Sequence, residues 1–219
     1  MVGLLIIAGL LFPSGAKATS LEFLAAWGGL GTGPAQFNSP SVVAVDAGGN
    51  AYVADAFNHR IQTFDSCHRW TSTLGGFGPA AGQLNAPLGV AFDSQGNLYV
   101  ADANNNRIEV FGPSGAFLHA WGSFGSGNGQ FRLPAAVAID SNDEVFVLDV
   151  DNNRVQVFDT TGTFLRGWGK FGSGNGQFSS PFGIATDPLG RVYVADTGNN
   201  RVQAFDSTGK FLRKWGSFG

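Results

Sequence analysis

Two seven-residue segments, Gly125–Phe131 and Gly172–Phe178, share the sequence GSGNGQF and have the glycine content of a phosphate-binding loop. Such loops bind phosphate where backbone N–H groups converge at the start of a helix, and a nucleotide site needs only one. Here the same slot recurs as GTGPAQF at Gly31–Phe37 and GPAAGQL at Gly78–Leu84, with fewer glycines. Each copy precedes a proline and an apolar run rather than a helical pattern. We therefore interpret the loop as a connection between structural units.

Aspartate and arginine recur together, five residues apart, in each of these units. Arginines arranged around a ring could bind an anion, but a binding site rarely needs the same residue in every unit. A carboxylate beside a turn can accept backbone N–H groups and pair with the guanidinium, which stabilises the turn. We therefore predict a structural role for these pairs, which are Asp55 with Arg60, Asp102 with Arg107, Asp149 with Arg154, and Asp196 with Arg201.

The residues that could bind metal do not form a recognisable site. His59, His68 and His119 occupy three different positions of the repeat, whereas catalytic zinc needs about three converging protein ligands. The densest carboxylates are Asp140, Asp143, Glu144, Asp149 and Asp151. They lack the Asp-x-Asp-x-Asp-Gly spacing of a calcium loop. Cys67 is the only cysteine and has no partner motif. The sequence predicts no metal, no cofactor and no catalytic residue.

Charge and the first residues suggest where the protein acts. The 13 Lys and Arg against 16 Asp and Glu give a net charge of −3, which argues against a nucleic-acid partner. Val2–Phe12 is apolar but too short to span a bilayer, and Ala16-Lys17-Ala18 is a cleavage pattern. We predict a signal peptide over residues 1–18, secretion to the periplasm or the extracellular space, and no membrane span after cleavage. An uncleaved anchor or a structured strand is the alternative.

The elements that position these residues repeat every 47 residues, as Pro40, Pro87, Pro134 and Pro181 illustrate. Four units follow, over residues 28–74, 75–121, 122–168 and 169–215. The second unit contains four apolar runs separated by turn residues, at Gly89–Phe92, Leu98–Ala101, Ile108–Phe111 and Phe117–Trp121. Four antiparallel strands in about 45 residues make one propeller blade, so we predict an all-β protein.

The same units resemble the NHL repeat, through NHR at Asn58–Arg60 and NNR at Asn105–Arg107, Asn152–Arg154 and Asn199–Arg201. The resemblance implies a β-propeller domain over residues 19–219, usually of six blades. This chain holds four units, so we expect an open arc or part of a six-bladed ring, with a closed four-blade ring as the alternative. The larger ring is favoured because Glu22–Trp27 copies the outer strand of a unit and the final GSFG copies the start of one.

Specificity should lie where the units differ, because the repeated positions build the scaffold. Two variable sets flank strand ends: Phe57, Asn104 and Asp151 after the turn aspartate, and Ser41, Leu88 and Phe182 after the loop proline. We predict an exported, non-enzymatic scaffold that binds a protein, peptide or saccharide there and self-associates to complete a ring. The alternatives are a metalloenzyme resembling propeller lyases or lactone hydrolases, with part of its site missing from this chain, and an RNA-binding NHL domain.

Overall fold

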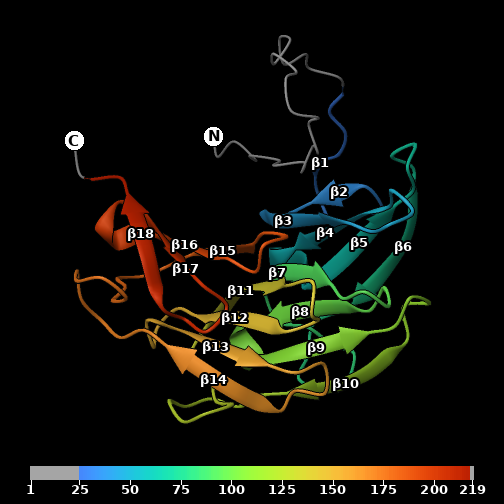
Figure 1. Cartoon of the computed structure of the whole chain (residues 1–219). Coiled ribbons are helices and arrows are strands. Elements are labelled where there is room, and N and C mark those ends of the chain that lie inside the picture. Colours follow the sequence, from blue (N-terminus) through green and yellow to red (C-terminus); the bar gives the residue numbers. More distant parts are fainter. Residues whose placement is uncertain (1–24, 218–219) are drawn as a thin grey trace.

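The computed structural model describes residues 25–217 and shows four antiparallel sheets of four strands, here called blades 1 to 4 (Figure 1). Blade 1 contains β3 (Pro40–Val45), β4 (Ala51–Asp55), β5 (Arg60–Phe64) and β6 (Trp70–Gly75). Blade 2 contains β7 (Pro87–Phe92), β8 (Leu98–Asp102), β9 (Arg107–Phe111) and β10 (Phe117–Trp121). Blade 3 contains β11 (Pro134–Ile139), β12 (Val145–Asp149), β13 (Arg154–Phe158) and β14 (Phe164–Trp168). Blade 4 contains β15 (Gly183–Thr186), β16 (Val192–Asp196), β17 (Arg201–Phe205) and β18 (Phe211–Trp215).

Short elements connect these strands. A parallel pair, β1 (Gly29–Leu30) with β2 (Gln36–Phe37), closes the loop before blade 1. One-turn 3₁₀ helices follow the second strands of three blades: η1 (Ala56–Asn58), η2 (Ala103–Asn105) and η3 (Thr197–Asn199). The predicted signal peptide, residues 1–18, and the first half of the strand copy at Glu22–Trp27 lie outside the described residues.

Each blade is a meander whose strand order follows the sequence, because tight polar turns join neighbouring strands. In blade 2, Asp93 Oδ1 accepts the backbone N–H groups of Gln95 and Asn97 at 2.9 and 2.8 Å. Gly96 between them has a φ of +80°, which glycine adopts at little cost. The turn sets the register that pairs Val90 with Val100. The four strands predicted in the second unit are confirmed, although β7 begins two residues earlier and β8 and β9 are each one residue longer than predicted.

The blades stand side by side in an open arc. The inner strands contact one another in sequence, β3 with β7, β7 with β11 and β11 with β15. Within residues 25–217, β15 and β3 do not form an inner-strand contact of this kind. The expectation of an open arc of four blades is thus confirmed, and the alternative of a closed four-blade ring is wrong.

The core lies between the blades rather than inside them. Tyr99 and Ile108 of blade 2 pack against Phe131, Val147 and Phe158, which belong to blade 3 and the loop that leads into it. Because blades 2 and 3 have a neighbour on each side, their strands must be apolar on both faces. This explains why LYVAD and VFVLD are buried at every position instead of alternating.

In blades 1 to 3, a large side chain at the end of the outer strand seals the interface against a turn of the next blade. Trp121 lies on Gly162 of blade 3, and Trp168 lies on Gly209 of blade 4. A Cβ added at Gly162 would approach Trp121 Cδ2 to 2.6 Å. In blade 1 this turn position is His68, whose ring stacks on Trp27 at a centroid distance of 4.3 Å. This turn position therefore takes either a glycine, which leaves room for the large side chain, or a residue whose ring stacks on it.

Gly162→Ala tests this packing, with Gly190→Ala as the matched control. Both glycines have positive φ (+86° and +73°), but an added Cβ at Gly190 meets nothing within 4 Å. The control should lose about 1–2 kcal/mol from left-handed backbone strain, and Gly162→Ala a further 1–3 kcal/mol, roughly, from overpacking. Urea unfolding measures both. Equal losses in the two variants would show that Trp121 does not need the glycine.

Candidate functional site

One end of every blade is built around a buried aspartate at the close of the second strand. In blade 3, Asp149 Oδ1 accepts the backbone N–H of Arg132 at 2.7 Å. Its Oδ2 accepts Asn152 Nδ2 at 2.9 Å, Arg154 Nε at 2.7 Å and Gln156 Nε2 at 3.3 Å. The carboxylate is completely buried and is held by charge-assisted and neutral hydrogen bonds together. It therefore joins a turn, a strand and the preceding loop.

The arginine partner extends this network into the loop between blades. Arg154 Nη1 donates to Ser126 O at 2.8 Å, and Nη2 donates to Gly127 O and Gln130 O at 2.8 and 2.9 Å. With Nε on Asp149, four of its five N–H donors are engaged. An incoming anion would have to displace backbone carbonyls, so this arginine is not a ready anion site.

The same geometry recurs at the other predicted pairs. The Arg Nε–Asp Oδ2 distances are 2.8 Å for Arg60–Asp55, 2.8 Å for Arg107–Asp102 and 2.7 Å for Arg201–Asp196. Each guanidinium also donates to carbonyls of the loop before its blade. The structure thus brings all eight of these residues together in pairs, blade by blade.

The GSGNGQF loops run between blades, and their N–H groups donate within the loop or to the buried glutamine of the blade that follows. Gly125 N donates to Phe131 O at 3.0 Å, and Gly127 N donates to Gln130 Oε1 at 3.0 Å. Phe131 is fully buried and fixes the far end of the loop. These N–H groups do not converge on an open cradle, and a strand rather than a helix follows.

We call the surface made by these loops and by the turns after β4, β8, β12 and β16 the loop rim. The first variable set lies on it, with Phe57 64% exposed and Asn104 and Asp151 also exposed. Their backbone N–H groups donate to loop carbonyls: Phe57 to Asn38 O, Asn104 to Asn85 O, and Asp151 to Arg132 O. The backbone is fixed at these positions while the side chains are free to vary.

The second variable set lies elsewhere. Ser41 Oγ donates to Pro87 O of the next blade at 3.2 Å, and Leu88 packs against the core cluster around Ala135 of blade 3. These two side chains therefore belong to the interfaces between blades. Phe182 has the same place in blade 4 and is 52% exposed.

A row of exposed apolar side chains on the loop rim was missed by the sequence reasoning. One begins each loop between blades, and their exposed fractions are 86% for Leu30, 69% for Phe77, 66% for Phe124 and 74% for Phe171. The His59 ring lies 4.8 Å from Phe77, and the Arg132 guanidinium lies 4.9 Å above Phe124. The 47-residue spacing of these side chains is visible in the sequence. The sequence does not show which apolar residue of each loop is exposed, because the loop also holds a second phenylalanine or leucine that packs inward.

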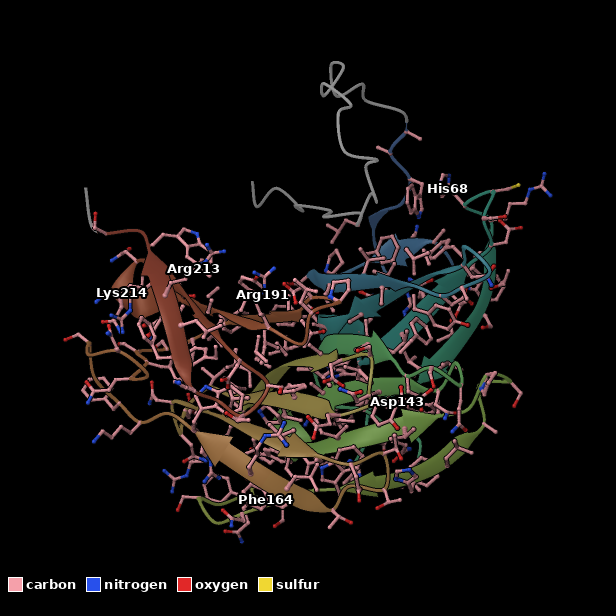
Figure 2. All side chains as sticks on the ribbon, viewed as in Figure 1. His68, Asp143, Phe164, Arg191, Arg213 and Lys214 are labelled. Atoms are coloured by element: carbon pink, nitrogen blue, oxygen red, sulfur yellow. The ribbon has the colours of Figure 1, made fainter. Side chains whose placement is uncertain are left out.

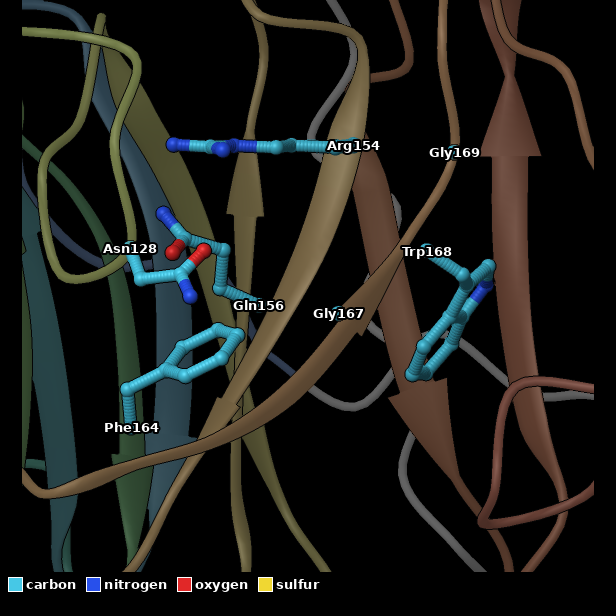
Figure 3. Close-up of a pocket in the computed structure, with 7 residues that line it drawn as sticks. All are labelled: Asn128, Arg154, Gln156, Phe164, Gly167, Trp168 and Gly169. Atoms are coloured by element: carbon cyan, nitrogen blue, oxygen red, sulfur yellow. The ribbon is translucent and has the colours of Figure 1, made fainter.

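A small pocket lies beside the outer strand of blade 3, lined by Asn128, Arg154, Gln156, Phe164, Gly167, Trp168 and Gly169 (Figure 3). One of its lining residues is Gly167, at a position where the other blades carry Thr73, Ala120 and Lys214. In the close-up, Phe164 and Trp168 lie on opposite sides of β14. Arg154 and Gln156 are already hydrogen-bonded to the loop, whereas Trp168 Nε1 is buried without a hydrogen-bond partner.

Among residues 25–217, no three or more His, Cys, Asp and Glu side chains gather to hold a metal ion. In Figure 2, His68 lies on blade 1 while Arg213 and Lys214 lie on blade 4, at the other end of the arc. No helix within these residues is long and apolar enough to cross a membrane.

Comparison with known proteins relates the chain to one repeat family. A family model described as NHL repeat matches residues 37–64, 84–111, 131–158 and 178–205. NHL repeat-containing protein 3 of Homo sapiens is 50% identical over 48 residues, which is 21% of this chain and 14% of that protein. The Mus musculus protein of that name matches to the same extent.

Solved structures share the fold at low identity. A streptogramin B lyase superimposes with a TM-score of 0.63 and 16% identity, covering 80% of this chain and 53% of that chain. A chain of a nidogen/laminin complex gives a TM-score of 0.62 and 20% identity, covering 82% and 64%. Hydrazine synthase of Kuenenia stuttgartiensis gives 0.62 and 15%, covering 85% and 52%. The chain spans about half to two thirds of these structures, and the likeness concerns the fold alone.

Proposed function

The chain belongs to the NHL-repeat family, and from this premise we propose that it is a binding scaffold that holds a protein or peptide partner on its loop rim. The observation that carries the proposal is the row Leu30, Phe77, Phe124 and Phe171, exposed at one equivalent position in every unit. Large apolar side chains that are exposed together on one surface are typical of interaction sites.

The loop rim is suited to binding because it is both apolar and rigid. Aromatic side chains are enriched in protein interfaces and dominate their energetics. Each phenylalanine starts a loop whose carbonyls are held by an arginine, as Arg154 holds the loop after Phe124. A surface ordered before binding costs less conformational entropy when the partner arrives.

Selectivity comes from the residues that differ between units. Phe57, Asn104 and Asp151 stand on the same rim and offer, in turn, an aromatic ring, an amide and a carboxylate. The apolar row would supply affinity while these side chains choose among partners. A polypeptide fits this mixture of apolar and polar groups, and a saccharide is the alternative ligand.

Replacing Phe77, Phe124 and Phe171 together by serine tests the proposal. The matched control replaces Leu118, Leu165 and Leu212, which share one outer-strand position and are 51%, 44% and 46% exposed. Wild type and control should select the same peptides from a displayed library. The rim variant should bind them at least tenfold more weakly, because each aromatic hot spot contributes about 2 kcal/mol.

Two outcomes would contradict the proposal. One is equal peptide binding by the rim variant and wild type. The other is failure of wild type to select peptides while it binds sugars on a glycan array, which would favour the saccharide alternative. Unfolding curves of the three proteins ensure that a loss of binding is not a loss of fold.

We further propose that the free face of blade 4 is covered by self-association. Trp121 seals the interface between blades 2 and 3, and its equivalent Trp215 is 45% exposed beside Tyr193. Leu88 packs between blades, and its equivalent Phe182 is exposed. This face therefore repeats the apolar character of a blade interface but lacks its neighbour within residues 25–217.

Sedimentation analysis checks this second proposal. Wild type should have at least twice the mass of one chain at micromolar concentration, and Trp215→Ser with Phe182→Ser should have the mass of one chain. A single-chain mass for wild type at every concentration would contradict it.

A further inference from the structure

One buried position breaks the repeat in blade 2. Two residues after the network arginine, three units carry glutamine, as Gln62, Gln156 and Gln203, whereas the second unit carries Glu109. All four side chains are buried. An amide and a carboxyl have nearly the same shape but differ in one donor, so the exchange alters the hydrogen bonds more than the packing.

The glutamines show what the position requires. Their Oε1 accepts a loop N–H at 2.9–3.0 Å, from Ala35, Gly129 or Gly176. Their Nε2 donates to a loop carbonyl at 2.6–2.8 Å, on Gln36, Gln130 or Gln177. Nε2 also lies 3.1–3.3 Å from the network aspartate. The amide therefore uses one acceptor and both of its N–H donors in each of these blades.

Glu109 provides the same acceptor as the glutamines, but it has an oxygen, Oε2, where they have the donor Nε2. Its Oε1 accepts the N–H of Gly82 at 3.2 Å, which is the equivalent contact. Its Oε2 is buried without a hydrogen-bond partner. From the equivalent glutamine contacts in the other blades, we infer that Oε2 faces the carbonyl of Gln83 and Oδ2 of Asp102, which are both acceptors. Only a protonated carboxyl can donate to either of them.

The charged groups around Glu109 are few. Arg107, on the same strand, places Nη2 2.8 Å from Oε1, but its N–H groups also serve Asp102 and the carbonyls of Pro79, Ala80 and Gln83. Asp102, on β8, is the other charged neighbour. The loop of residues 78–84 carries no ionisable side chain. On β10, Ala120 pairs with Glu109, so the adjacent His119 points to the other face of the sheet.

These surroundings favour the neutral acid. Burial raises the pKa of Glu109 to about 7, with Asp102 adding to the rise and Arg107 opposing it. Burial also raises the pKa of Asp102 above its usual range, against the hydrogen bonds from Asn85, Asn105 and Arg107.

We propose that Glu109 is a proton-operated latch, whose neutral carboxyl donates its O–H to the Gln83 carbonyl and closes the blade 2 loop, and whose ionised form releases it. The proton is lost to solvent, and no other bond changes. Without the donor, two acceptors face a buried carboxylate, so the loop that carries Phe77 loosens. The consequence for partner binding rests on the proposed function, whereas the proton on Glu109 does not.

Carboxyl ¹³C labelling of glutamate tests the latch directly, because the chain has three glutamates, Glu22, Glu109 and Glu144. One signal should titrate near pH 7 and disappear in Glu109→Gln. A Glu109 midpoint at the ordinary value of about 4.3 would overturn the proposal. The measurement uses no partner, so its failure is distinct from failure of rim binding.

Stability and hydrogen exchange give a second readout. The folded state holds the proton to higher pH than the unfolded chain, so stability should fall as pH rises from about 4.5 to 7. In that window the unfolding equilibrium constant of wild type should grow by about tenfold per pH unit relative to Glu109→Gln. Amide exchange at Gln83 and Leu84 should accelerate in parallel, while that at Gln177 and Phe178 should not.

Gln156→Glu is the reciprocal variant and should transfer the same pH dependence to the blade 3 loop. Identical pH profiles for wild type and Glu109→Gln would overturn the latch.

Discussion

The structure depends on a buried carboxylate that must be satisfied once in every blade. An aspartate without its partners would cost several kcal/mol to bury, so its hydrogen bonds decide which backbone segments lie together. At Asp149 those bonds come from a loop N–H, a turn amide, an arginine and a glutamine. The arginine then binds three loop carbonyls. One buried carboxylate thus connects the hairpin of each blade to the loop that leads into that blade.

This constraint determines where function can lie. The repeated arginines are occupied with backbone, so the ring of positive charge suggested by the sequence is not available to a ligand. The network instead holds the loop rim still, and the side chains it does not use, among them Phe77, Phe124 and Phe171, are presented to solvent. Among the four networks within residues 25–217, only the one in blade 2 is short of a donor, at Glu109. That makes blade 2 the segment whose order can depend on pH.

Much of the fold could be predicted because the repeat places each residue type in register, so four weak strand patterns in one unit support those in the others. The Asp–Arg spacing likewise indicated the pairing. Exposure could not be predicted, because Phe124 and Phe131 are the same residue type in one loop, yet the first is exposed and the second is buried. Leu88 and Ser41 were predicted from the sequence to be binding residues, but they contact the neighbouring blade. Glu109 had no visible significance until its burial and its partners were known. The signal peptide and export remain predictions from sequence.

The central claim is that the Asp–Arg network organises each loop between blades, and Arg154→Lys tests it most directly by hydrogen exchange and urea unfolding. Lysine keeps the charge but cannot hold Asp149 and three carbonyls at once. The expected result is a loss of about 2–4 kcal/mol, with faster amide exchange concentrated in residues 125–131. The control Arg213→Lys, at an exposed arginine over Trp215, should change stability by less than about 0.5 kcal/mol. A loss at Arg154 no larger than that of the control, with loop exchange unchanged, would contradict the account.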